Sequence, residues 1–70
     1  MEYTKKYPNG RFKFERSGLF GRGDWVYVYM NGEKVDEFEL SESDKETIKT
    51  SESHFAFLCS IWYSDYGMDL

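Results

Sequence analysis

The dipeptide Asn31-Gly32, set between two runs of β-prone residues, constrains the fold of this chain more than any other feature. Asn-Gly is the preferred pair for a two-residue type I′ turn, because both residues tolerate a positive φ angle. The residues before it (24–30) are rich in aromatic and β-branched side chains, and the residues after it (33–40) place apolar side chains among charged ones. We therefore predict an antiparallel hairpin centred on Asn31-Gly32.

A regular hairpin of this kind predicts which side chains share a face of the sheet. A two-residue loop gives the cross-strand pairs Met30–Glu33, Val28–Val35 and Trp25–Phe38. Because side chains alternate along a strand, one face is expected to carry Val26, Val28, Met30 and Val35. The opposite face is expected to carry Trp25, Tyr27, Tyr29, Phe38 and Leu40.

A second hairpin is predicted around the sequence Tyr-Pro-Asn-Gly at 7–10. Proline presets the first turn angle, and Asn-Gly again tolerates a positive φ. Its strands would span 2–7 and 11–16, with Phe12 and Phe14 on one face. Residues 17–23 contain three glycines and predict a flexible or bulged connection to the next strand.

The polar stretch after Leu40 predicts a short helix near 44–50, because Ser43 and Glu46 have the spacing of a capping box. The fold class that follows is α+β: a small antiparallel β-sheet of three to five strands and two hairpins, with one or two short helices in the C-terminal half. We expect a single small domain over 1–70. The expected core consists of Val26, Val28, Met30, Val35, Ile48, Phe55, Leu58 and Trp62.

The stretch 53–66 fits two different structures. Its apolar residues have both helical and strand spacing, and Ser51 or Ser53 would suit a helix N-cap and Gly67 a helix C-terminus. Its aromatic and β-branched content favours a pleated surface. We therefore expect a strand here, with a helix as the alternative.

Size and composition exclude several classes of protein. Seventy residues bury only about 60% of the surface of the unfolded chain, which leaves little room for an enclosed active site. The single cysteine, Cys59, excludes an internal disulfide and a multi-cysteine zinc site. No apolar run reaches the roughly 18 residues of a membrane span, and no signal peptide is visible. A cytoplasmic protein without membrane contact is expected.

Two weak signals of chemistry have simpler explanations. His54 and Cys59 could form a nucleophilic pair, but Cys59 lies among apolar residues, where a thiol behaves as a small hydrophobe. The glycines of 17–23 with Arg22 could meet a phosphate, but no helix is expected to follow them. The twelve-residue calcium-loop pattern is absent. We therefore predict that the chain is not an enzyme and has no cofactor-binding or metal-binding residues.

Charge is distributed unevenly along the chain. Residues 1–23 hold six basic and two acidic residues, whereas 24–70 hold eleven acidic and three basic ones, and the net charge is −4. An acidic band of this kind either keeps the protein soluble or docks on a basic partner. For the second case we predict a partner-binding site made of the carboxylates Glu33, Asp36, Glu37, Glu39, Glu42 and Asp44 with the aromatic residues Tyr27 and Tyr29.

Small size, acidity and the lack of catalytic motifs predict a non-catalytic protein-binding module, an inhibitor or adaptor of a larger partner with a basic surface. In these general properties, though in no motif, the chain resembles phage-encoded inhibitors of bacterial defence, anti-CRISPR proteins among them. That resemblance implies a partner whose basic surface binds nucleic acid.

Two alternatives remain open. Aromatic residues make up 20% of the chain, and in the basic first third Phe12 and Phe14 alternate with Arg11 and Lys13. With Tyr27 and Tyr29 they could stack on the bases of single-stranded nucleic acid, although the overall negative charge opposes phosphate binding. Alternatively, the surplus aromatic residues could seal a homodimer.

Overall fold

The computed structural model describes all 70 residues as a four-stranded antiparallel sheet followed by two helices. In chain order the elements are β1 (Glu2–Tyr7), β2 (Gly10–Arg16), the 3-10 turn η1 (Leu19–Gly21), β3 (Trp25–Met30), β4 (Glu33–Glu39), α1 (Glu42–Thr50), α2 (Ser53–Asp65) and the 3-10 turn η2 (Gly67–Asp69). The strands lie side by side in the order β1-β2-β3-β4, so β1 and β4 are the two edges. The predicted α+β class is confirmed.

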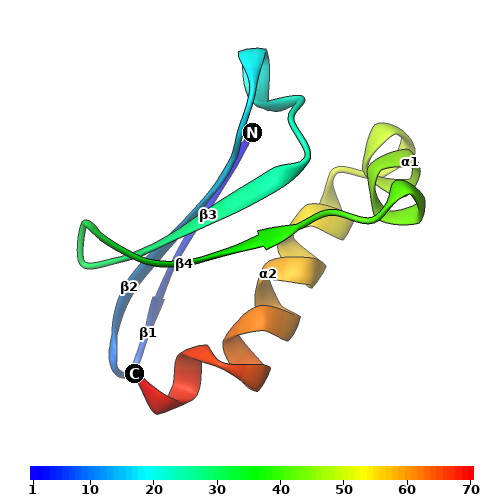
Figure 1. The fold of residues 1–70 in the computed structure, drawn as a ribbon. Helices are drawn as coiled ribbons and strands as arrows, with labels where there is room; N and C mark the ends of the chain where they lie inside the picture. Colours follow the sequence, from blue (N-terminus) through cyan, green and yellow to red (C-terminus); the bar gives the residue numbers. More distant parts are fainter.

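The molecule has two layers. Figure 1 shows α2 crossing one face of the sheet, while the other face has no helix over it. The core lies between the layers and consists of Phe12, Phe14, Val26, Val28, Leu40, Ile48, Phe55, Cys59 and Trp62. The sheet contributes its apolar face to this core and α2 contributes residues four and three positions apart, as an amphipathic helix does.

Both predicted hairpins are confirmed. Asn31 and Gly32 have φ angles of 52° and 86°, as a type I′ turn requires. In the first hairpin Tyr7 pairs with Gly10 across a two-residue loop. Phe12 and Phe14 share one face of β2, and both are fully buried.

The predicted register of the β3–β4 hairpin is wrong beyond its first two pairs. Met30 pairs with Glu33 and Tyr29 with Lys34, but Val28 then pairs with Asp36. Val35 is therefore an extra residue, a β-bulge, and every later residue of β4 moves to the opposite face from the one predicted.

This shift corrects three face assignments. Val35, expected in the core, is 40% exposed. Phe38 and Leu40, expected opposite the core, instead pack against it or lie within it. Asp36 also turns toward the helix layer, where it accepts a hydrogen bond from the indole of Trp62. The bulge is favourable because it buries two large apolar side chains and exposes one smaller one.

The expectation of a strand at 53–66 is wrong, since these residues form α2. A strand would place Phe55, Phe57, Cys59 and Ile61 on one face, yet Phe57 and Ile61 are exposed. The reason is tertiary. The inner face of the sheet is apolar and needs a covering layer, which a helix provides and a fifth strand at the sheet edge does not. This packing outweighs the β propensity of the side chains.

The first helix begins earlier than predicted. It starts at Glu42, and its N-cap is Ser41 rather than Ser43, because the Ser41 hydroxyl accepts a hydrogen bond from the Asp44 N–H at 3.0 Å. Leu40 is buried and its N–H donates to the Asp24 carbonyl. The chain is therefore held to the sheet up to Leu40, and Ser41 is the first residue free to cap a helix.

Candidate functional site

The open face of the sheet carries the two predicted aromatic site residues, Tyr27 and Tyr29. Each lies beneath a lysine: Lys34 Nζ is 4.8 Å from the ring centre of Tyr27, and Lys13 Nζ is 5.0 Å from that of Tyr29. The register places Trp25, also exposed, in the same row of β3. The result is a half-exposed aromatic row in which the two tyrosine rings contact cations of the same chain.

The edge strand β4 carries three of the predicted carboxylates at its surface. Glu33 and Glu39 have no ion-pair partner, and Glu37 pairs with Lys34 at 2.6 Å. Glu39 lies opposite Trp25, and Glu37 lies opposite Tyr27. The structure therefore brings Glu37, Glu39 and Tyr27 together on the open face, beside a sheet edge that has no neighbouring strand.

The remaining predicted carboxylates form contacts within the chain. Asp36 Oδ2 accepts a hydrogen bond from Trp62 Nε1 at 2.7 Å, and Asp44 Oδ1 lies 2.9 Å from His54 Nε2. The hydrogen bond with His54, together with that from the Ser41 hydroxyl, lowers the pKa of Asp44 below its ordinary value. Glu42 pairs with Lys45. Asp36 and Asp44 thus have a structural use that the sequence did not indicate.

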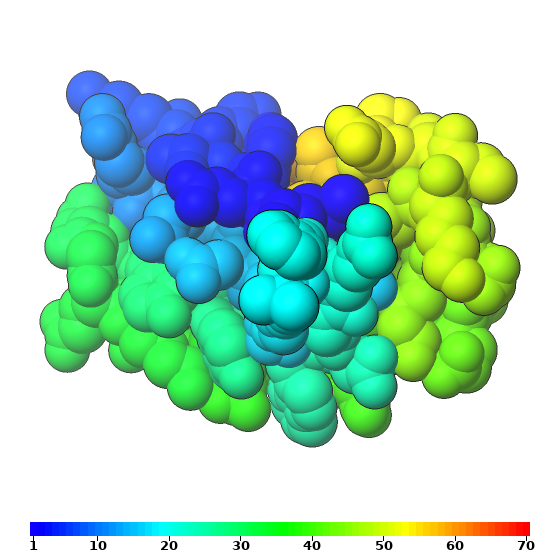
Figure 2. Space-filling model, turned by 90° about the horizontal axis from the view of Figure 1, so that it is seen from above, coloured from blue at the N-terminus to red at the C-terminus, as the bar shows by residue number.

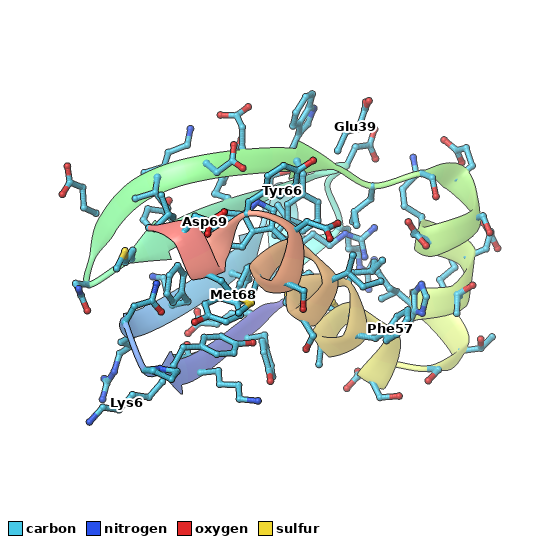
Figure 3. The ribbon with its side chains drawn as sticks, turned by 90° about the horizontal axis from the view of Figure 1, so that it is seen from below. Lys6, Glu39, Phe57, Tyr66, Met68 and Asp69 are labelled. Atoms are coloured by element: carbon cyan, nitrogen blue, oxygen red, sulfur yellow. The ribbon has the colours of Figure 1, made fainter.

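An apolar groove lies between β4 and α2, on the helix side of the edge. It encloses about 180 Å³, and its floor consists of Phe38, Leu40, Leu58, Ile61, Trp62 and Tyr66. The only charged residues around it are Glu39, Asp44 and Asp65. In Figure 3, Tyr66 lies between α2 and the strand that carries Glu39, whereas Phe57 lies on the side of α2 away from that strand.

Sequence reasoning missed the helical half of this groove. Because a strand was expected over 53–66, four residues of this stretch were not grouped as part of a site: Leu58, Ile61, Asp65 and Tyr66. Their spacing of three and four residues was the available signal, because it places them on one face of a helix.

Two other hollows carry mixed or positive charge. The larger, about 540 Å³, lies between the N-terminus, the loop 17–23 and α1, and Figure 2 shows it between the dark blue, cyan and yellow segments. Its charged residues are Glu2, Arg16, Arg22, Lys49 and Glu52. The other, about 370 Å³, lies on the open face beside Tyr29 and is lined by Arg11 and Lys13.

The structure does not bring the candidate nucleophile and base into a reactive arrangement. Cys59 is fully buried in the core, and burial raises the pKa of its thiol to about 12, so the thiolate is scarce at neutral pH. His54 is engaged with Asp44. No group of three or more His, Cys, Asp or Glu side chains is placed to hold a metal ion.

The glycine loop is closed upon itself. Gly23 N–H donates to the Ser17 carbonyl, and the Gly23 carbonyl accepts from Arg16 Nε at 2.7 Å. The chain enters β3 soon afterwards, as expected, so no helix follows this loop in the chain. It presents the two most exposed apolar side chains of the molecule, Leu19 and Phe20.

No family model matches the chain, and no curated protein or solved structure shows significant similarity to it. None of its helices is long and apolar enough to cross a membrane. Function must therefore be inferred from the surfaces described above.

Proposed function

We propose that this protein is a non-catalytic binding module, an inhibitor or adaptor, that docks on a basic surface of a larger protein through β4. The observation that carries the proposal is the combination of carboxylates, aromatic side chains and an unpaired strand edge at one place. Carboxylates give register and fast encounter with a basic partner, while aromatic side chains supply contact energy at low entropic cost.

Carboxylates without a basic partner inside the chain support β4 as the partner-binding surface. Glu33 and Glu39 on β4 and Asp65 on α2 have no basic partner among the ion pairs of the molecule. Glu37 and Glu42 pair only with exposed lysines, and such pairs contribute little to stability. These side chains are therefore free to exchange their partners for those of another protein. A nucleic-acid-binding surface on that protein has the required positive charge.

The test is a quadruple variant that carries Glu33→Gln, Glu37→Gln, Glu39→Gln and Glu42→Gln. It omits Asp36 and Asp44, because their internal hydrogen bonds would confuse folding with binding. The wild type and the variant are compared in pull-downs from native host lysate at low and at high salt. We expect the wild type to retain a protein partner at low salt and to lose it at high salt, and the variant to retain none.

A control variant replaces two exposed glutamates outside this surface, Glu46→Gln and Glu52→Gln, and we expect it to behave as the wild type does. Equal retention of the partner by the quadruple variant, with the same salt dependence, would refute the proposal.

Single-stranded nucleic acid is the second candidate ligand, and the open face favours it through Tyr29 beside Arg11 and Lys13. Two of the four aromatic residues first considered, Phe12 and Phe14, are fully buried and have no surface on which a base could stack. Titration of a labelled oligonucleotide at low salt distinguishes the candidates. Binding that Tyr29→Ala abolishes and that the quadruple variant retains would favour nucleic acid.

A further inference from the structure

The strongest unassigned feature is the groove between β4 and α2, because it lies beside the free edge of the sheet. The most exposed apolar residues lie elsewhere: Leu19 and Phe20 belong to the loop 17–23. Phe57, also exposed, lies on the far side of α2. Only in the groove do apolar side chains, unpaired backbone and charge of a single sign occur together.

We infer that this groove binds an extended polypeptide segment that alternates basic and apolar residues and adds to the sheet as a fifth strand beside β4. The inference rests on the proposed protein-binding function and names the chemistry of the segment that is bound. Strand addition takes its affinity from main-chain hydrogen bonds and its specificity from alternate side chains.

The size of the groove argues for a side chain rather than a small molecule. Its volume of about 180 Å³ is below the range of about 300–1,000 Å³ that is typical of small-molecule sites. Phe38, Ile61 and Tyr66 line it, and Ile61 and Tyr66 are 42% and 61% exposed. An apolar side chain from an added strand would cover these two residues and gain free energy from the buried area.

The bulge at Val35 determines which part of β4 can pair. A bulge twists a strand and interrupts its ladder, so the regular segment of β4 is Asp36–Glu39. Within it Phe38 faces the helix layer, whereas Glu37 and Glu39 face the open side. An added strand would therefore place apolar side chains beside Phe38 and basic side chains beside Glu37 and Glu39.

The charge of the edge excludes a second copy of this chain as the occupant. In β4, four carboxylates stand against a single cation, Lys34. Antiparallel pairing of two β4 strands would bring carboxylates opposite one another, and charged edges of this kind prevent self-association. Asp65 and Asp44 at the rim add further negative charge. A strand with basic side chains beside Glu37 and Glu39 would instead be attracted to this edge.

The test uses a synthetic peptide that alternates lysine and valine, titrated against the full chain at low salt with backbone amide NMR as the readout. We expect saturable binding, with shifts concentrated in Asp36–Leu40 and Leu58–Tyr66 and slowed amide exchange in β4. A peptide with glutamate in place of lysine should not bind. The lysine-valine peptide N-methylated at alternate residues along the pairing edge should bind at least about tenfold more weakly, because it cannot complete the ladder.

Variants of the protein locate the contact. Glu39→Gln with Asp65→Asn should weaken binding by roughly three- to tenfold, while Glu46→Gln with Glu52→Gln should leave it unchanged. Ile61→Ser should also weaken binding, while Phe57→Ser, an exposed apolar residue on the other side of α2, should not. Both serine variants alter exposed side chains, so they are expected to fold.

Three results would overturn the inference: undiminished binding of the N-methylated peptide, tighter binding of a peptide of the same composition with helical spacing, or concentration-dependent dimerisation of this chain through β4. If the peptide fails to bind but the quadruple glutamine variant still loses its lysate partner, the strand-addition model fails and the proposed function stands. Peptide binding without any salt-sensitive protein partner would count against the proposed function instead.

Discussion

A single hydrogen bond connects the centre of the core to the edge of the sheet. Trp62 is almost completely buried, yet its indole N–H reaches Asp36 on β4 at 2.7 Å. A buried indole needs an acceptor, and a charged acceptor makes the stronger bond. The bulge at Val35 supplies that acceptor, because without the register shift Asp36 would face the open side of the sheet.

Replacing Asp36 tests this connection. Asp36→Ala leaves the indole N–H without its acceptor and is expected to lower the free energy of unfolding by about 1–2 kcal/mol. Asp36→Asn keeps an acceptor oxygen in the same place and should cost less. Urea unfolding followed by tryptophan fluorescence measures both variants. Equal stability of the alanine variant and the wild type would show that the bond contributes nothing.

The pair Asp44–His54 predicts a pH dependence of stability. The pKa of Asp44 is lowered in the folded state, chiefly by the hydrogen bond with His54. A carboxyl group with a lowered pKa stabilises the fold above its unfolded value of about 4, and this contribution is lost as the pH falls through the folded value. We expect Asp44→Asn to be less stable than the wild type at neutral pH.

The difference in stability between wild type and Asp44→Asn should shrink as the pH falls below about 4, which urea titrations at a series of pH values would show. A difference that stays constant over that range would contradict the assignment of this lowered pKa to Asp44.

At the scale of the elements, the β-bulge decides which face of β4 belongs to the core. The hairpin contains one valine that is buried in the core and one that the bulge exposes. Val26 is fully buried in β3, while Val35 at the bulge is 40% exposed. The same chemical change at the two positions should therefore have different effects.

Threonine has nearly the shape of valine and adds a hydroxyl. We expect Val26→Thr to destabilise the protein by about 1–3 kcal/mol, because the hydroxyl is buried without an assured partner. Val35→Thr should change stability by no more than about 0.5 kcal/mol. Thermal or urea unfolding provides the comparison. Similar losses for both variants would mean that the register of a regular hairpin, with Val35 inside, is the correct one.

At the scale of the whole molecule, the first turn holds the C-terminal end of the chain. Asn9 Nδ2 donates to the carbonyls of Gly67 and Leu70, and its Oδ1 accepts from the Tyr63 hydroxyl. The rings of Tyr7 and Tyr63 stack nearby, with centroids 3.5 Å apart. Burial raises the pKa of Tyr7, in agreement with its position under α2. These contacts join the two ends of the sequence.

Removing the hydrogen bonds of Asn9 should destabilise the whole fold, because they join distant parts of the chain. Two of the three connect residues that are 58 or more positions apart. We expect Asn9→Ala to lower the free energy of unfolding by about 1–3 kcal/mol, and Tyr63→Phe, which loses one bond, to lower it by less. The measurement is urea unfolding with an unchanged m value. Asn9→Ala with wild-type stability would show that these hydrogen bonds are dispensable.

Local chemistry was enough to predict both hairpins, the helix after Leu40 and the α+β class. Asn31-Gly32 tolerates the positive φ angles of its turn, and Pro8 presets the first angle of the other, so neighbouring residues alone specify these turns. The burial of Val26, Val28, Ile48, Phe55 and Trp62 also followed from apolar character. The carboxylates Glu37 and Glu39 were predicted as site residues from their charge, but the predicted alternation placed them on the face opposite Tyr27. The bulge at Val35 brings them to the side of Tyr27.

The bulge at Val35 depended on contacts that no local pattern contains, and the local pattern of 53–65 allowed both a helix and a strand. A one-residue shift in β4 leaves local propensity unchanged, but it turns Phe38 and Asp36 toward Trp62, which is distant in sequence. Likewise, α2 is helical because the apolar face of the sheet requires a cover. The groove between β4 and α2 exists because β4 has this register and because 53–65 is helical. Only the tertiary structure could therefore show it. The turns depend on covalent geometry, while the register and the covering helix depend on which arrangement buries the most apolar surface.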